Sequence, residues 1–292
     1  MSAFQCAWML ALLLSPAVAA AQVPYRTVVI FGDTQTTAKG DPNQYADFTS
    51  QIRLIHLRVQ LGVRLMPRNT ATPNAASTST LLRKLFDEEI LVASSPLVFG
   101  EDDLTPGERQ LVAKAVVSRR CEFSTGRVLA RGLLRELGSE TAELLRDSDR
   151  VPIWPEGVVG SISHCDDLCA VAIGDRARFR GVGLDVEPDE PVKEGVERVV
   201  CGPGESAWLD LAKGEERSRR IKMVFSIKEA VYKAFYPELR AFWGFQDVQT
   251  EIDLEGERFR ASLPEGPEVR EIEGRVVRRQ GWILSAVTRR RT

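Results

Sequence analysis

The sequence predicts an α+β protein, and three observations support that class. Apolar residues recur with helical spacing over two long segments, residues 119–137 and 215–235. Short apolar runs typical of strands lie between and after these segments. Helices and strands come in groups rather than in strict alternation, which favours an α+β fold over a parallel α/β sheet.

The first clear helix start lies at Thr105. Its side chain can cap a helix, Pro106 suits the first turn, and Glu108 completes a capping box. The next helix is expected over residues 119–137, with Gly138 as a natural stop. Its buried face would carry the residues Phe123, Val128, Leu129, Leu133, Leu134 and Leu137.

The remaining elements follow from shorter patterns. Three apolar runs predict strands over residues 160–164, 168–173 and 182–186. A short helix is expected at residues 191–200 and a long one at 215–235. Four more strands are expected at residues 248–254, 259–263, 270–277 and 282–287.

Residues 1–78 read differently from the rest and form an N-terminal extension. The apolar run Ala7–Ala21 resembles a secretory signal with a cleavage site before Gln22, although it contains no Lys or Arg. It is shorter than the roughly 20 residues of a typical membrane span, so no stable span is expected. Residues 69–80 have the composition of a linker. An over-long reading of the start, with Met66 as the true first residue, is the other interpretation.

Composition excludes some classes of protein. The net charge is only −2, which argues against bulk binding to nucleic acid or to an anionic membrane. The five cysteines are odd in number and sparse, unlike a disulfide scaffold. Cys165 and Cys169 adjoin His164, but no second Cys/His pair completes a tetrahedral zinc set.

The sharpest chemical signal lies in the predicted strand around residues 183–187. Asp185 and Glu187 are two apart, so they project from one face of the strand. Leu184 and Val186 would then enter the core. Neighbouring carboxylates repel each other unless a cation lies between them, and such hard oxygen ligands suit magnesium. A strand end with two solvated acids is the alternative.

Three further groups are open to two interpretations each. Glu229 and Lys233 share one helical face, either as a surface ion pair or as a pair facing a cleft. His164 ends a predicted strand, where it is either structural or a phosphate contact. Arginines on the helix from residue 119 either recognise phosphates or line a solvated face with Glu122 and Glu136 as partners: Arg119, Arg120, Arg127 and Arg131.

Taken in order, these segments resemble the 4'-phosphopantetheinyl transferase superfamily. The similarity is to its larger monomeric class, of the surfactin type and the enterobactin synthase component D type. It is carried by residues 119–127 (RRCEFSTGR), 154–165 (WPEGVVGSISHC), 183–187 (GLDVE) and 225–233 (FSIKEAVYK). Phe225 stands where the family often has Trp. The resemblance covers residues 81–289 and not the N-terminal part.

The resemblance implies two similar α+β lobes that form a pseudo-dimer, over residues 79–181 and 182–292. It implies a cytoplasmic enzyme that moves the phosphopantetheine arm of coenzyme A to a serine of an apo acyl, peptidyl or aryl carrier protein, with siderophore or other secondary-metabolite synthesis as the pathway. Mg²⁺ would be bound by Asp185, Glu187 and Glu229. Glu229 and Lys233 would be catalytic. Glu229 or a metal-bound water would help to deprotonate the carrier serine, and Lys233 would stabilise charge on the pyrophosphate or assist proton transfer. Coenzyme A would be bound by Arg119, Arg127, Arg146, Ser163, His164 and Lys228.

Two other functions compete with this one. A magnesium-dependent phosphohydrolase acting on a diphosphate would share the carboxylates but would need no surface for a carrier protein. A non-catalytic protein that binds carrier proteins would not need an intact set of acidic and basic residues. The presence of Asp185, Glu187, Glu229 and Lys233 together argues against the second alternative.

Overall fold

The computed structural model describes residues 75–140, 143–264 and 270–291. The signal-like run, the possible start at Met66 and most of the N-terminal extension lie outside these residues. Among the residues so described, none of the helices combines the length and the hydrophobicity that a membrane span requires.

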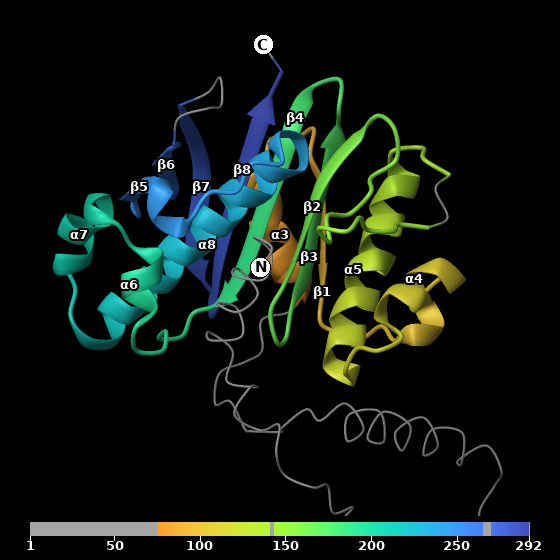
Figure 1. Cartoon of the computed structure of the whole chain (residues 1–292), viewed down its shortest axis with the longest axis horizontal. Helices are drawn as coiled ribbons and strands as arrows, with labels where there is room; N and C mark the ends of the chain where they lie inside the picture. The colour runs from red at the N-terminus through yellow and green to blue at the C-terminus, as the bar shows by residue number, and fades with distance from the viewer. Residues whose placement is uncertain (1–74, 141–142, 265–269, 292) are drawn as a thin grey trace, which may run out of the picture. The chain divides into compact units, whose positions relative to one another are not determined.

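The first half of the described chain forms a three-stranded antiparallel sheet in the order β1-β3-β2 (Figure 1). The helix α5 packs against this sheet, with Leu134 and Ile173 among the side chains in the shared core. The elements in chain order are α3 (Ala75–Leu85), β1 (Leu91–Ser95), η3 (Glu101–Asp103), α4 (Pro106–Val112), α5 (Val117–Glu136), β2 (Val158–His164) and β3 (Cys169–Asp175).

The second half forms a five-stranded antiparallel sheet in the order β4-β8-β7-β6-β5. The long helix α8 lies across β4 and β8 (Figure 1). The elements are β4 (Phe179–Pro188), α6 (Val196–Val200), α7 (Pro203–Asp210), α8 (Gly214–Leu239), η4 (Phe245–Asp247), β5 (Gln249–Asp253), β6 (Arg258–Ser262), β7 (Glu271–Arg279) and β8 (Trp282–Arg290).

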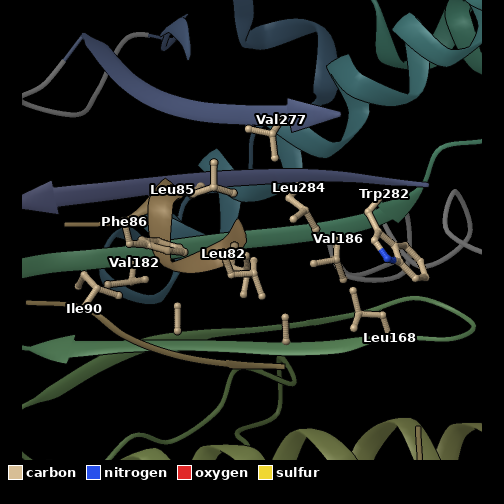
Figure 2. Close-up of a cluster of buried hydrophobic side chains, with 14 of the residues drawn as sticks. Leu82, Leu85, Phe86, Ile90, Leu168, Val182, Val186, Val277, Trp282 and Leu284 are labelled. Carbon is tan, nitrogen blue, oxygen red and sulfur yellow. The ribbon is translucent and has the colours of Figure 1, made fainter. Parts of the chain in front are cut away.

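Strands β4 and β8 of the five-stranded sheet are buried on both faces. Successive side chains of β8 point to opposite faces. Leu284 joins a cluster with Leu82 of α3 and with Phe86, the residue after that helix, whereas Ile283 joins the cluster beneath α8. Figure 2 shows the α3 side chains meeting Val182 of β4 and Leu284 of β8. Helix α3 is therefore part of the core.

Two serines join the two sheets where β2 lies beside β4. Ser161 Oγ accepts a hydrogen bond from the Leu184 backbone N–H at 3.1 Å. Ser163 Oγ accepts one from the Val186 N–H at 3.3 Å. These side chains give β4 polar contacts with the neighbouring sheet, although β2 and β4 belong to different sheets.

Helix α8 approaches β4 closely because two positions on the strand have no side chain. A Cβ atom at Gly183 would lie 1.9 Å from the Ala230 carbonyl oxygen. A Cβ at Gly181 would lie 2.0 Å from the carbonyl oxygen of Ala234. The pair of glycines thus fixes how near the helix, with its acidic and basic residues, comes to the strand.

Most predicted elements are confirmed, including the α+β class and the capping box at Thr105. The linker interpretation is wrong for residues 75–80, which form the first turns of α3. The short helix expected from residue 191 begins only at Val196. Strand β1 and helix α7 had not been predicted.

Candidate active site

Side chains alternate between the two sides of strand β4, so its acidic residues lie on one side and its apolar residues on the other. Leu184 and Val186 are fully buried in the core. Asp185 and Glu187 project from the other side of the strand, where Asp185 is only 3% exposed and Glu187 is partly exposed. Burial of a carboxylate is costly without a cation or hydrogen-bond donors nearby, so the surroundings of Asp185 define the site.

Asp185 is bonded to one residue of β2 and to one residue of α8. Ser163 Oγ on β2 donates a hydrogen bond to Asp185 Oδ1 at 2.9 Å. Lys233 Nζ on α8 lies 2.6 Å from the same oxygen and also donates to Ser163 Oγ at 3.0 Å. The second carboxylate oxygen, Oδ2, is buried and makes no hydrogen bond within the described residues.

The carboxylates of Asp185, Glu187 and Glu229 interact electrostatically. Burial, reinforced by the charge of Asp185, raises the pKa of Glu187. Burial raises the pKa of Glu229 in the same way, with Asp185 again adding to the rise. Protons therefore compete for these groups when no cation is present.

No three His, Cys, Asp or Glu side chains within the described ranges are gathered as a formed metal site. The donor chemistry nevertheless fits a hard divalent cation. It comprises three mutually repelling carboxylates and a buried oxygen, Asp185 Oδ2, that lacks a partner. A divalent ion would offset the repulsion between the carboxylates and would provide a partner for Asp185 Oδ2.

Lys233 is a cation rather than a proton acceptor in this setting. Burial acts to lower its pKa, but the negative charges of Asp185 and Glu229 outweigh it and raise the pKa of Lys233. The ammonium therefore stays charged at neutral pH. It is suited to stabilising negative charge on a substrate, whereas removing a proton would need the neutral amine.

A basic group lies on α5 and the segment that follows it. Arg127 is 4% exposed, and its Nε makes no hydrogen bond within the described residues. Its guanidinium lies over the Phe123 ring, 4.2 Å from the centroid, and that of Arg146 lies 5.8 Å from the same centroid. Burial, with the like charges of Arg119 and Arg146, lowers the pKa of Arg127. A buried cation among like charges favours an anionic ligand.

Arg119 and His164 connect this basic group to the carboxylates. Arg119 Nη1 donates to His164 Nε2 at 2.5 Å and contacts Glu122 Oε2 at 2.9 Å. Burial, followed by the charges of Arg119 and Lys233, lowers the pKa of His164 well below its ordinary value. The imidazole is therefore neutral at pH 7, and the residue before it on β2, Ser163, is bonded to Asp185.

Several arginines and one lysine have other partners. Arg131 forms a buried ion pair with Glu108, and Arg120 pairs with Glu101. Lys228 is 2% exposed, pairs with Glu205 at 3.0 Å and donates to the Val200 carbonyl. The structure thus does not bring Lys228 to the other predicted coenzyme A contacts. Nor do these arginines form a solvated face.

A cleft opens beside Lys233 between the elements that carry the site. It is lined by α8 at Lys233 and Pro237 and by the starts of β2 and β4 at Gly160 and Gly181, with Trp154 covering Gly160. Of the acidic and basic site residues described above, only Lys233 lines this cleft.

Sequence reasoning missed Phe123 as a member of the basic group. The signal was present, because Phe123 and Arg127 are four residues apart on a helix and so share a face. Glu122 had been noted only as a possible surface partner of the arginines. It lies 3.5 Å from His164 Nδ1 and so helps to orient the imidazole.

Two family models match the chain. The model of the 4'-phosphopantetheinyl transferase N-terminal domain matches residues 107–174, and that of the 4'-phosphopantetheinyl transferase superfamily matches residues 181–285. Together they include the basic group, β2, β4 and α8.

Curated relatives agree with these matches. The 4'-phosphopantetheinyl transferase Npt of Nocardia iowensis is 37% identical over 56% of this chain and 74% of its own. The 4'-phosphopantetheinyl transferase PptT of Mycobacterium tuberculosis is 33% identical over 62% and 84%. Enterobactin synthase component D of Escherichia coli K12 is 33% identical over 54% and 74%. The chain therefore belongs to the 4'-phosphopantetheinyl transferase superfamily.

Proposed function

We propose that this protein transfers the phosphopantetheine arm of coenzyme A to a serine of an apo carrier protein, leaving 3',5'-ADP. The observation that carries the proposal is the meeting of two groups of opposite character. Asp185, Glu187 and Glu229 form a cation-attracting group in which Asp185 is bonded to Lys233 and Ser163. The next residue on β2, His164, is bonded to Arg119 of the basic group around Arg127. A magnesium diphosphate ester needs both.

The three carboxylates are the proposed ligands of Mg²⁺. When bound, the ion supplies positive charge beside the diphosphate under attack. Asp185 would offer Oδ2, because Oδ1 is already bonded to Ser163 and Lys233. Glu229 comes from α8 and is the candidate base for the carrier serine, with a water bound by the ion as the alternative.

The phosphates of coenzyme A are assigned to Arg119, Arg127, Arg146 and His164. Arg127 is the anchor of this set because its Nε has no partner among the described residues. His164 is neutral, so it contributes a hydrogen bond rather than a charge. Lys233 would stabilise negative charge that develops on the diphosphate, next to the carboxylates.

We also propose that the chain has two lobes of the pseudo-dimer kind, over residues 79–181 and 182–292. The family models support this division, since one ends at residue 174 and the other begins at 181. Each lobe has its own sheet, with α5 on one and α8 on the other, and the boundary falls within the first residues of β4. Because α3 begins at Ala75 and Thr78 is buried within it, the first lobe would begin a few residues before residue 79, at the start of this helix.

The carrier is proposed to belong to a siderophore or other secondary-metabolite pathway. Similarity to proteins named enterobactin synthase component D supports this choice. Coenzyme A and carrier proteins are cytoplasmic, so the protein is proposed to act there, as a monomer. Comparing kcat/KM for an aryl or peptidyl carrier domain with that for a fatty-acid carrier tests the pathway assignment. A clear preference for the fatty-acid carrier would contradict it.

Incubation with coenzyme A, Mg²⁺ and an apo carrier domain tests the function itself. Mass spectrometry should show the carrier gaining one phosphopantetheine arm, and a carrier with its acceptor serine changed to alanine should stay unmodified. Hydrolysis of coenzyme A without modification of the carrier would instead indicate the phosphohydrolase. Binding of the carrier without either reaction would indicate the non-catalytic alternative.

A further inference from the structure

We propose that Ser163 is a positioning residue that orients Asp185 and Lys233, and that it is not a contact to coenzyme A. The inference rests on the proposed function. Ser163 adjoins His164 in sequence, but the two side chains leave β2 on opposite faces. His164 faces Arg119 and Glu122 of α5, whereas Ser163 faces Asp185 of β4.

The hydrogen-bonding capacity of the Ser163 hydroxyl is fully used. A serine hydroxyl offers one donor and two acceptor lone pairs. Its donor goes to Asp185 Oδ1 at 2.9 Å, and it accepts from Lys233 Nζ at 3.0 Å and from the Val186 N–H at 3.3 Å. The residue is only 3% exposed. A phosphate could bind this hydroxyl only by displacing one of these bonds.

These bonds determine how the carboxylate of Asp185 is oriented. Oδ1 accepts from both Ser163 and Lys233, which fixes the rotation of the carboxylate group. Oδ2 is thereby left buried and unbonded within the described residues. Residues that orient a ligand in this way typically change metal affinity or activity about 10- to 100-fold when they are removed.

Ser161 provides a matched control on the same strand. It lies two residues earlier on the same face of β2, and it is also 3% exposed. Its hydroxyl accepts from the Leu184 N–H at 3.1 Å, so it joins β2 to β4 as Ser163 does. Only Ser163 also touches Asp185 and Lys233. Comparing the two serines therefore separates a role in joining the sheets from a role in the site.

The test compares Ser163→Ala with Ser161→Ala. Calorimetry measures Mg²⁺ affinity with coenzyme A present and coenzyme A affinity with chelator present, and steady-state assays give kcat and KM. We expect Ser163→Ala to lower Mg²⁺ affinity or kcat by about 10- to 100-fold. Its affinity for coenzyme A without metal should match the wild type. Ser161→Ala should keep wild-type values of all four quantities.

Two results would overturn the inference. One is weaker metal-free binding of coenzyme A by Ser163→Ala, which would make the hydroxyl a ligand contact. The other is an equal loss in Ser161→Ala, which would make the effect one of sheet packing. Ser163→Cys covers the case in which the alanine variant does not fold, because it keeps the volume but bonds weakly. Wild-type Mg²⁺ affinity and kcat in Ser163→Cys would also overturn the inference.

Failure of the proposed function would look different. If the wild-type protein did not modify any carrier, the function would be wrong, yet the calorimetric comparison of the two serine variants would still test whether Ser163 orients the cation-binding carboxylate. If the wild type is active and only the Ser163 comparison fails, the function stands and the positioning role does not.

Discussion

Lys233 Nζ lies 2.6 Å from Asp185 Oδ1, so a cation from α8 is paired with a carboxylate from β4. The pair joins the helix and the strand at the point where Gly181 and Gly183 let them approach closely. Glu229 lies one turn earlier on the same helical face as Lys233. One helix therefore supplies both a candidate metal ligand and a candidate stabiliser of substrate charge.

The first prediction concerns this lysine. Lys233→Met should lower kcat by about 100-fold or more, because it removes the charge that we propose stabilises the reacting diphosphate. Lys233→Arg should retain part of the activity because it keeps the charge. Lys213→Met, at an exposed lysine before α8, is the control and should leave kcat unchanged. If Lys233→Met had the wild-type kcat, Lys233 would not be a catalytic residue.

The second prediction is a pH dependence of Mg²⁺ stabilisation. The pKa values of Glu187 and Glu229 are raised in the folded protein. Their contribution to stability is therefore complete below the unfolded pKa and is lost as the pH rises through the folded pKa. Without metal, Tm should fall as the pH rises from about 4.5 to about 8, and the rise in Tm on adding Mg²⁺ should grow over the same range.

Glu187→Gln provides the control for this pH effect, since its side chain does not titrate. Its metal-free Tm should vary less steeply with pH than that of the wild type. A Mg²⁺-induced rise in Tm that was larger at the lower pH would contradict the assignment of these carboxylates as ligands.

The third prediction concerns the buried arginine of the basic group. Arg127→Met should raise the KM for coenzyme A by about 10- to 100-fold, since a charge-assisted hydrogen bond contributes about 1.5–3 kcal/mol. The effect on kcat should be smaller. Arg120→Met is the control on the same helix, because Arg120 pairs with Glu101. Equal KM values for the two variants would exclude Arg127 from the phosphate site.

The fourth prediction concerns the contact between β4 and α8. Gly183→Ala should lower the free energy of unfolding by about 3 kcal/mol or more, because the new methyl group would meet the Ala230 carbonyl oxygen. Gly132→Ala is the matched control in α5, where no atom lies within 4 Å of the added Cβ. That variant should be more stable by about 0.5–1 kcal/mol. Denaturant unfolding of both variants measures the difference.

Structural features that depend only on residues close together in the sequence could be predicted from local patterns. The capping box at Thr105 involves residues three apart, and the alternation of Leu184 and Asp185 on β4 follows from strand geometry. The chemistry of the carboxylates could be inferred because Asp185 and Glu187 are two apart on one strand. Such relationships need no knowledge of the rest of the fold.

Long-range partners could not be predicted in the same way. The composition of residues 75–80 resembles a linker, but packing of Leu82 and Phe86 into the core fixes helix α3 there. Lys228 shares a motif with Glu229, yet it pairs with Glu205 of α7, a helix that sequence patterns did not reveal. Tertiary contacts determine that residues 75–80 are helical and that Lys228 pairs with Glu205. Such contacts cannot be read from the pattern of residues that are adjacent in the sequence.

The most direct test of the account is Mg²⁺ binding measured by calorimetry in the presence of coenzyme A. The wild type should bind the ion, and Asp185→Asn, Glu187→Gln and Glu229→Gln should each weaken that binding by about tenfold or more while remaining folded. Arg120→Met should bind as the wild type does. Wild-type affinity in Glu229→Gln would contradict the central claim, because the helix would then contribute no ligand to the site on β4.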